Sequence, residues 1–79
     1  SGLWTPSDYR LKHSIRATGR MAIQPMSIPE YEFCYSGDDT VYIGVMAQDV
    51  IAKAPEAVKE IGGYLHVNYD KLGIRMYRK

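Results

Sequence analysis

Glycine and proline interrupt this chain so often that it can form only short elements of secondary structure. Seven glycines and four prolines are spread over 79 residues, which argues against a helical bundle. The single cysteine, Cys34, cannot form an internal disulfide. A chain of this length buries only about 60% of its unfolded surface, so its core is marginal by itself. We therefore expect one small domain that is stabilised by oligomerisation or by attachment to a longer parent chain.

The composition excludes several classes of function. Hydrophobic residues make up 46% of the chain and charged residues 24%, which is typical of a globular chain rather than a disordered one. A formal net charge of +1 gives no general attraction for nucleic acid, and no apolar stretch is long enough to span a membrane. No Cys/His cluster has the spacing of metal ligands. We expect no cofactor, no metal, no nucleic-acid partner and no membrane partner.

Two pairs of strand-like segments each flank a turn, and each pair predicts a β-hairpin. Tyr31–Tyr35 alternates aromatic with smaller or polar residues, and Thr40–Val45 returns after the turn sequence SGDD. The segments Val58–Ile61 and Tyr64–Tyr69 are separated by Gly62-Gly63, which is a hairpin-turn signal. The predicted fold class is a small α+β domain with antiparallel hairpins.

Helix signals are weaker and few. Ser7 is a suitable N-cap for a short turn, Ala47–Ala54 has helical propensity, and Asp70 is a candidate cap for a final short helix. Residues 16–29 show no period, which predicts a loop with a short strand near Met21–Ile23. The predicted core consists of apolar and aromatic side chains: Tyr31, Phe33, Tyr42, Met46, Val50, Ile51, Val58, Leu65, Val67, Tyr69 and Leu72.

Most side chains that carry chemistry have simple structural explanations. His13 and His66 lie beside no nucleophile in the sequence, and Cys34 between aromatic residues indicates a buried, unreactive thiol. Ser7 and Lys12 are different, because a lysine whose pKa is lowered by burial can activate a serine nucleophile. By spacing alone, however, this pair is better explained as an N-cap serine and a solvent-facing lysine than as a nucleophile and its base.

The surroundings of that pair resemble a known family. Ser7–Ile15 has the sequence SDYRLKHSI, which closely resembles the Ser-Asp-x-Arg-Leu-Lys-x-x-Ile opening of the endosialidase-type intramolecular chaperone domains of bacteriophage tail spikes and fibres. Further matching segments follow in the family order: Tyr31-x-Phe33, IGVMAQDV at Ile43–Val50, PEAV at Pro55–Val58 and VNYDKL at Val67–Leu72. The resemblance therefore extends from Ser7 to Leu72.

The resemblance implies a self-cleaving chaperone. Members of this family help a trimeric fibre to fold and then cut themselves off before the motif serine. Carried over, the scissile bond is Pro6–Ser7, Ser7 is the nucleophile and Lys12 is its general base. Asp8 and Arg10 match the motif and would hold its geometry. Gln48 also matches, and we expect it to be a structural amide that bonds to backbone.

The resemblance also implies an oligomeric state and a location. We expect a homotrimer joined to an upstream tail spike or fibre, in the host bacterial cytoplasm during phage assembly, or in the virion tail if uncut. Residues 1–6 would be the upstream lead-in and residues 7–79 the chaperone domain, with the family's C-terminal coiled-coil helix absent or truncated. We expect Lys12 to lose its water only when the trimer closes, which would couple cleavage to assembly.

Two other functions fit the same residues. The first is a tip or trimerisation module of a tail fibre that keeps the fold without cleaving. The second, if the motif match is coincidental, is a small protein-binding domain unrelated to fibres.

Overall fold

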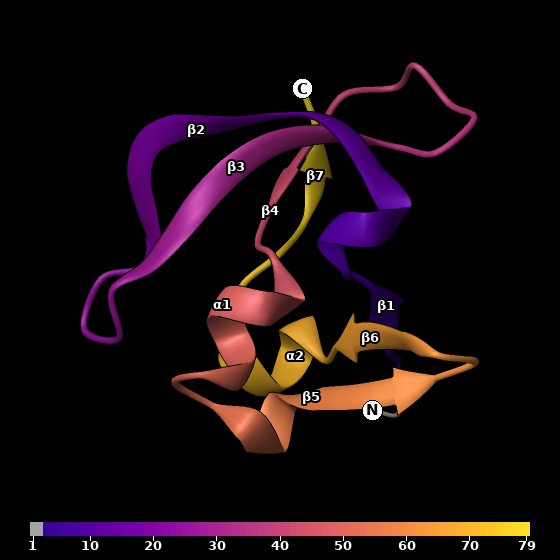
Figure 1. Ribbon diagram of the computed structural model, residues 1–79. Coiled ribbons are helices and arrows are strands. Elements are labelled where there is room, and N and C mark those ends of the chain that lie inside the picture. Colours follow the sequence, from indigo (N-terminus) through magenta and orange to yellow (C-terminus); the bar gives the residue numbers. More distant parts are fainter. Residues whose placement is uncertain (1–2) are drawn as a thin grey trace.

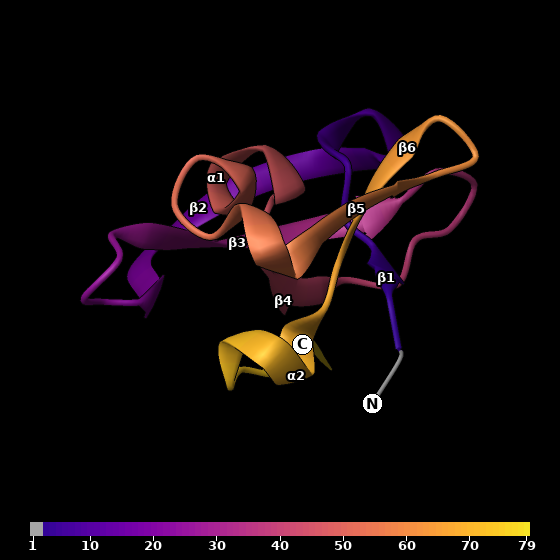
Figure 2. The same ribbon diagram turned by 90° about the horizontal axis from the view of Figure 1, so that it is seen from below.

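The computed structural model describes residues 3–79 as two antiparallel sheets with short helices between and beside them (Figures 1 and 2). One sheet has the order β1-β6-β5, with bounds Thr5–Pro6, Tyr64–Val67 and Val58–Ile61. The other has the order β2-β3-β4-β7, with bounds Lys12–Ile23, Ile28–Tyr35, Tyr42–Gly44 and Tyr77–Arg78. The helices are α1 (Ala47–Ile51) and α2 (Tyr69–Leu72), with 3-10 turns η1 (Tyr9–Leu11) and η2 (Pro55–Ala57). The predicted α+β class, with antiparallel hairpins and one or two short helices, is confirmed, and the structure has two short α-helices.

Both predicted hairpins form. β5 and β6 pair in the register Ile61↔Tyr64, and the two residues between them, Gly62 and Gly63, have φ angles of 61° and 87°. Positive φ at both central positions is the requirement of the tight turn that matches strand twist, which explains the glycine pair. β3 and β4 also pair antiparallel, as expected from the alternation in Tyr31–Tyr35.

Although the short strand expected near Met21–Ile23 does exist as the end of β2, the prediction of a loop over residues 16–29 is wrong. This stretch contains most of β2 and the start of β3, which form the long curved hairpin at the top of Figure 1. β2 is an edge strand whose side chains are mainly exposed, and its register with β3 shifts in three places, so no period of two survives in the sequence. Opposite charges join the two strands, Arg16 with Glu32 and Arg20 with Glu30.

The lead-in at the N-terminus belongs to the fold. Thr5 and Pro6 form β1 and pair with Val67 and His66 of β6, although the sequence predicts only an extended segment there. Ser7 does not cap a helix: the side chain of Asp8 accepts a hydrogen bond from the Arg10 amide and caps η1 instead. Residues 1–2 of the expected lead-in lie outside the described residues.

The two α-helices are shorter than expected. α1 ends at Ile51 rather than Ala54, and Pro55 then begins η2. The final helix is capped by Asn68, whose side chain accepts a hydrogen bond from the Lys71 amide, and not by Asp70. Gly73, with φ of 71°, ends α2 in the left-handed conformation and stops the helix before it reaches Met76.

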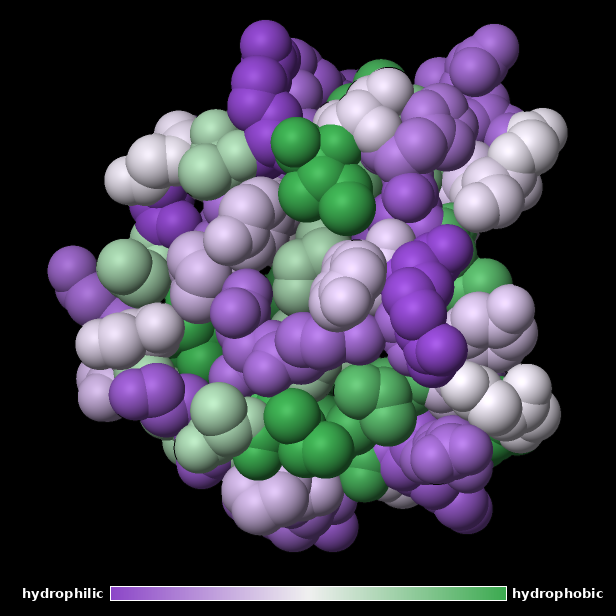
Figure 3. Space-filling model, viewed as in Figure 1, coloured by the Kyte–Doolittle hydropathy of each residue, from purple (hydrophilic) through white to green (hydrophobic). Residues whose placement is uncertain are grey.

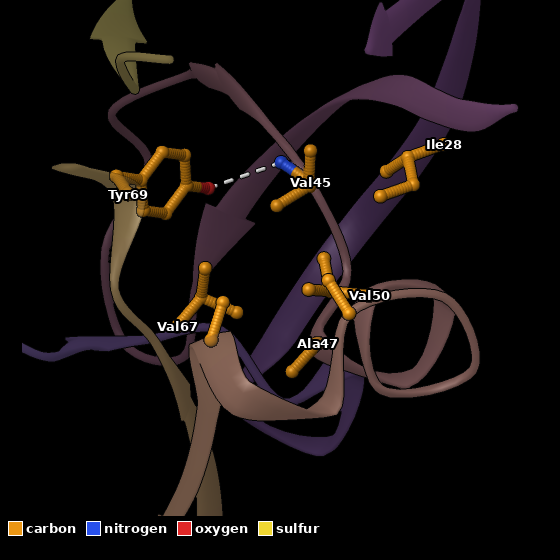
Figure 4. Packing of buried hydrophobic residues seen from close by; sticks show 8 residues of the cluster. Ile28, Val45, Ala47, Val50, Val67 and Tyr69 are labelled. Atoms are coloured by element: carbon orange, nitrogen blue, oxygen red, sulfur yellow. Dashed lines mark hydrogen bonds between the residues drawn. The ribbon is translucent and has the colours of Figure 1, made fainter. Parts of the chain in front are cut away.

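The core lies where α1 contacts both β3 of the larger sheet and β6 of the smaller one (Figure 1). Figure 4 shows Val45, Val50 and Val67 converging there, with the Tyr69 hydroxyl accepting a hydrogen bond from the Val45 amide at 3.0 Å. A Cβ at Gly44 would lie 2.5 Å from that hydroxyl oxygen, which accounts for glycine at this position.

The predicted core is partly right. The buried members of the predicted set are Phe33, Met46, Val50, Val67 and Tyr69, whereas Tyr31, Tyr42, Val58, Leu65 and Leu72 are half-buried. Ile51 is exposed, because it lies on the outer face of α1. Several small or isolated apolar residues outside the predicted set are also buried: Ile28, Ile43, Val45, Ala47, Ala54 and Ala57.

The face in Figure 3 mixes polar and apolar side chains, with a continuous hydrophobic area below its centre. Among residues 3–79, no helix has the length and hydropathy that crossing a membrane requires.

Candidate active site

Ser7 and Lys12 meet inside the protein. The side chain of Ser7 is fully buried, and its Oγ lies 3.0 Å from Nζ of Lys12. Ser7 follows β1 and Lys12 begins β2, so the intervening 3-10 turn brings the two side chains together. Both groups also donate to the backbone carbonyl of Val45, at 2.7 Å from Ser7 Oγ and 2.8 Å from Lys12 Nζ. Serine and lysine at this separation have the geometry of a nucleophile and its base.

Lys12 has the electrostatic properties that a base needs. Its side chain is 7% exposed, and its Nζ lies 3.9 Å from the ring centroid of Phe33 and 3.8 Å from Sδ of Met46. Burial lowers the pKa of Lys12 from 10.5 to about 7, although the negative charge of Asp8 acts in the opposite direction. A large fraction of this amine is therefore neutral near physiological pH.

Two expectations about this pair are wrong. Spacing alone favours a solvent-facing lysine, but Lys12 is buried against Phe33 of β3 and Met46, which directly precedes α1. The trimer was expected to remove water from Lys12, yet a single chain already does so. Desolvation of the base therefore does not depend on assembly.

Asp8 connects the motif to the rest of the domain. Its carboxylate is fully buried and accepts hydrogen bonds from the backbone and side chain of Arg10, from Gln48 Nε2 and from the Leu65 amide, at 2.8–3.0 Å. Hydrogen bonds from the Arg10 side chain are the largest cause of an Asp8 pKa far below the ordinary range. Burial acts in the opposite direction, and the hydrogen bond from the Leu65 amide lowers the pKa further. Asp8 thus joins η1, α1 and β6 around Ser7.

Arg10 and Gln48 complete this support. Arg10 also donates to the Gly63 carbonyl at 2.8 Å, and its guanidinium lies 5.0 Å from the ring centroid of Tyr64. Gln48 Oε1 accepts from the Tyr9 amide at 3.1 Å, so this side chain does bond to backbone as the sequence predicts. Neither residue contacts Lys12 through a hydrogen bond that the structure records.

The peptide bond between Pro6 and Ser7 is held at both of its polar groups. The Ser7 amide donates to the Leu65 carbonyl at 3.0 Å. The Pro6 carbonyl accepts a hydrogen bond from the Tyr35 hydroxyl at 2.7 Å. The bond next to the Ser7 hydroxyl therefore has a fixed orientation.

The remaining chemically interesting residues lie elsewhere. His13 is exposed and bonds to the Asp38 carbonyl, His66 is half-buried in β6, and Cys34 is buried in β3. Trp4 lies over its own domain, with Lys59 Nζ 5.4 Å from its ring centroid. Within residues 3–79, no three His, Cys, Asp or Glu side chains gather as metal ligands.

Two participants could not be found from the sequence. Tyr35 is distant from Ser7 in the chain and reaches the site because β2 and β3 pair Lys12 with Tyr35. Val45 contributes only its backbone carbonyl, which no side-chain pattern reveals. Comparisons with protein-family models, curated proteins and solved structures find no match for this chain.

Proposed function

We propose that this chain is a self-cleaving domain that cuts its own Pro6–Ser7 bond, with Ser7 as nucleophile and Lys12 as general base. The observation that carries the proposal is the buried contact of 3.0 Å between Ser7 Oγ and a lysine whose pKa is lowered to about 7. A buried amine beside a buried serine is costly for a fold, and a catalytic role accounts for it.

The chemistry follows from the geometry. A neutral amine has two N–H bonds and one lone pair, so Lys12 can donate to Val45 and still accept the Ser7 hydroxyl proton. The nucleophile is covalently next to the carbonyl it attacks, which gives a high effective concentration without a substrate pocket. An acyl shift from nitrogen to oxygen gives an ester, which water then hydrolyses.

The biological setting is proposed from the resemblance of the motifs in Ser7–Leu72. On that basis the domain is the C-terminal intramolecular chaperone of a phage or prophage tail spike or fibre, acts as a homotrimer and releases itself from the upstream polypeptide. The position of Asp8, Arg10 and Gln48 around Ser7 supports this proposal, because the three motif residues form one hydrogen-bonded cluster.

One contact favours the alternative of a structural tip or trimerisation module that does not cleave. The Ser7 hydroxyl donates to the Val45 carbonyl at 2.7 Å, and Lys12 donates to the same oxygen. In this arrangement the serine proton does not point to the lysine. Cleavage requires that the hydroxyl rotate toward Lys12, whereas a structural module needs no such change.

The test is the intact mass of the chain carrying its natural upstream residues, after purification and incubation. We expect a fragment that begins at Ser7, and we expect Ser7→Ala and Lys12→Met to abolish it. Exposed positions supply the matched controls, Ser27→Ala and Lys53→Met, which should cleave like the parent chain. A parent chain that is trimeric but never cleaves would refute self-cleavage and establish the structural alternative.

The pH dependence of cleavage is a separate prediction. Only neutral Lys12 can act as base, so the rate should rise about tenfold per pH unit below pH 7 and level off above it. Single-turnover rates between about pH 5 and pH 10 would measure this profile. A rate that still increases tenfold between pH 8 and 9 would mean that Lys12 keeps an ordinary lysine pKa.

A further inference from the structure

The hydroxyl of Tyr35 donates a hydrogen bond to the carbonyl of the peptide bond that we propose is cut. Tyr35 Oη lies 2.7 Å from the carbonyl oxygen of Pro6, and its next contact, to Met76 Sδ, is longer at 3.4 Å. A tyrosine hydroxyl has a single proton, and the shorter distance directs it to the carbonyl. The hydrogen bond therefore polarises the carbonyl group next to Ser7.

The ring of Tyr35 is held in place on several sides. It packs edge-on against Phe33, with centroids 5.4 Å apart and an interplanar angle of 86°, and against Tyr42 at 5.5 Å and 64°. Across the strand pair it lies opposite Lys12, whose Nζ is 5.9 Å from the Tyr35 ring centroid. The same β2–β3 register thus positions the general base at Ser7 Oγ and this hydroxyl at the Pro6 carbonyl oxygen.

We infer that Tyr35 is a catalytic residue whose hydroxyl stabilises the oxyanion that forms on the Pro6 oxygen, an assignment that rests on the proposed self-cleavage. As Ser7 Oγ bonds to the Pro6 carbonyl carbon, its proton moves to Lys12 Nζ and the carbonyl π electrons move to the oxygen that Tyr35 contacts. The C–N bond then breaks, the electrons return from that oxygen, and the Ser7 nitrogen takes the proton from Lys12.

The same oxygen needs the same donor in the second half of the reaction. Water adds to the ester carbonyl and gives a proton to Lys12, and negative charge again develops on the Pro6 oxygen. The bond between that carbon and Ser7 Oγ then breaks, and Oγ takes the proton. A donor that is fixed before the reaction stabilises both tetrahedral intermediates without reorganising.

The protonation states of the two side chains are compatible. Burial raises the pKa of Tyr35 above its ordinary range, so the hydroxyl keeps its proton throughout the pH range in which Lys12 becomes neutral. A donor hydroxyl and an acceptor amine therefore coexist above about pH 7.

The test is Tyr35→Phe in the chain carrying its natural upstream residues. We expect the single-turnover rate to fall about 10²- to 10³-fold, as when one oxyanion donor is removed elsewhere, while the pH midpoint stays near 7. The matched control is Tyr31→Phe in the same strand, which should cleave like the parent chain. A Tyr35→Phe chain that folds and cleaves at the parent rate would overturn the role of Tyr35.

Two further results distinguish a wrong role for Tyr35 from a variant that fails to fold and from a failure of the proposed function. If Tyr35→Phe does not fold, replacement of Tyr35 by 3-fluorotyrosine keeps the ring and makes the hydroxyl a stronger donor. Faster cleavage would support the inference and an unchanged rate would refute it. A parent chain that never cleaves would instead refute the proposed function itself.

Discussion

Replacing Asp8 by asparagine is expected to lower the free energy of unfolding by about 2–4 kcal/mol. The carboxylate accepts five hydrogen bonds, and no water reaches it. An amide has the same shape but presents N–H groups to some of those donors, so donors face each other in a buried position. The ion-pair partner of Asp8, Arg10, is more than half exposed, and solvent screening of that charge places the loss below that of a fully buried ion pair.

Denaturant unfolding at neutral pH would measure the effect of Asp8→Asn. The matched control is Arg10→Met, because the Arg10 side chain is 54% exposed and its removal leaves Asp8 the Gln48 and Leu65 donors. We expect a clearly smaller loss for the control. A loss below about 1 kcal/mol for Asp8→Asn would contradict the view that this carboxylate holds η1, α1 and β6 together.

Acid should remove the contribution of Asp8. Its pKa is lowered in the folded state, so the stabilisation is fully present above the unfolded value of 3.8 and is lost as the pH falls toward the folded pKa. The stability of the parent chain should therefore decline below about pH 4 more steeply than that of Asp8→Asn.

Replacing Lys12 by methionine is expected to make the domain more stable while abolishing cleavage. Burial lowers the pKa of Lys12 from 10.5 to about 7, and this corresponds to a cost on the order of a few kcal/mol when the amine is protonated. Methionine fills a similar volume beside Phe33 and Met46 without this cost. Residues selected for reactivity commonly reduce stability in this way.

The sign of the pH dependence identifies the cause. Between about pH 7 and 10.5 the unfolded chain binds a proton at Lys12 that the folded chain does not, so the parent chain gains stability as the pH rises. The difference in unfolding free energy between Lys12→Met and the parent chain should therefore be largest below pH 7 and shrink toward pH 10. Unfolding free energies at pH 6 and pH 9, with exposed Lys53→Met as control, would measure this. An equal difference at both pH values would show that the burial of the amine is not responsible.

The sequence predicts the elements whose signals are local. Gly62-Gly63 determines its hairpin because two successive positive φ angles leave few alternatives. Tyr31, Phe33 and Tyr35 follow the period of two that a strand imposes, with Phe33 buried and the two tyrosines half-buried. β2 could not be recognised, since an exposed edge strand with bulges needs no apolar period. Asn68 rather than Asp70 caps α2 because the end of β6 determines where that helix begins.

The candidate site likewise combines residues that the sequence predicts with residues that only the fold brings together. The resemblance of residues 7–15 to a family motif predicts Ser7 and Lys12 as a pair, and the structure places Ser7 Oγ 3.0 Å from Lys12 Nζ. Tyr35 and the Val45 carbonyl depend on strand register and on a backbone atom, so only the folded chain shows them. The burial of Lys12 follows from its packing against Phe33. Phe33 lies outside residues 7–12, so the spacing of Ser7 and Lys12 could not predict this burial.

The pairing of β1 with β6 means that hydrolysis and separation would be different events. Thr5 and Pro6 pair with β6, and the Ser7 amide bonds to Leu65 in the same strand, so both sides of a severed Pro6–Ser7 bond would stay docked on one strand. The immediate product would be a nicked complex with a new carboxylate and a new amine close together, a geometry that also permits religation. Departure of the upstream polypeptide would then require peeling β1 from β6, so its rate would respond to mechanical tension or denaturant independently of the chemical step.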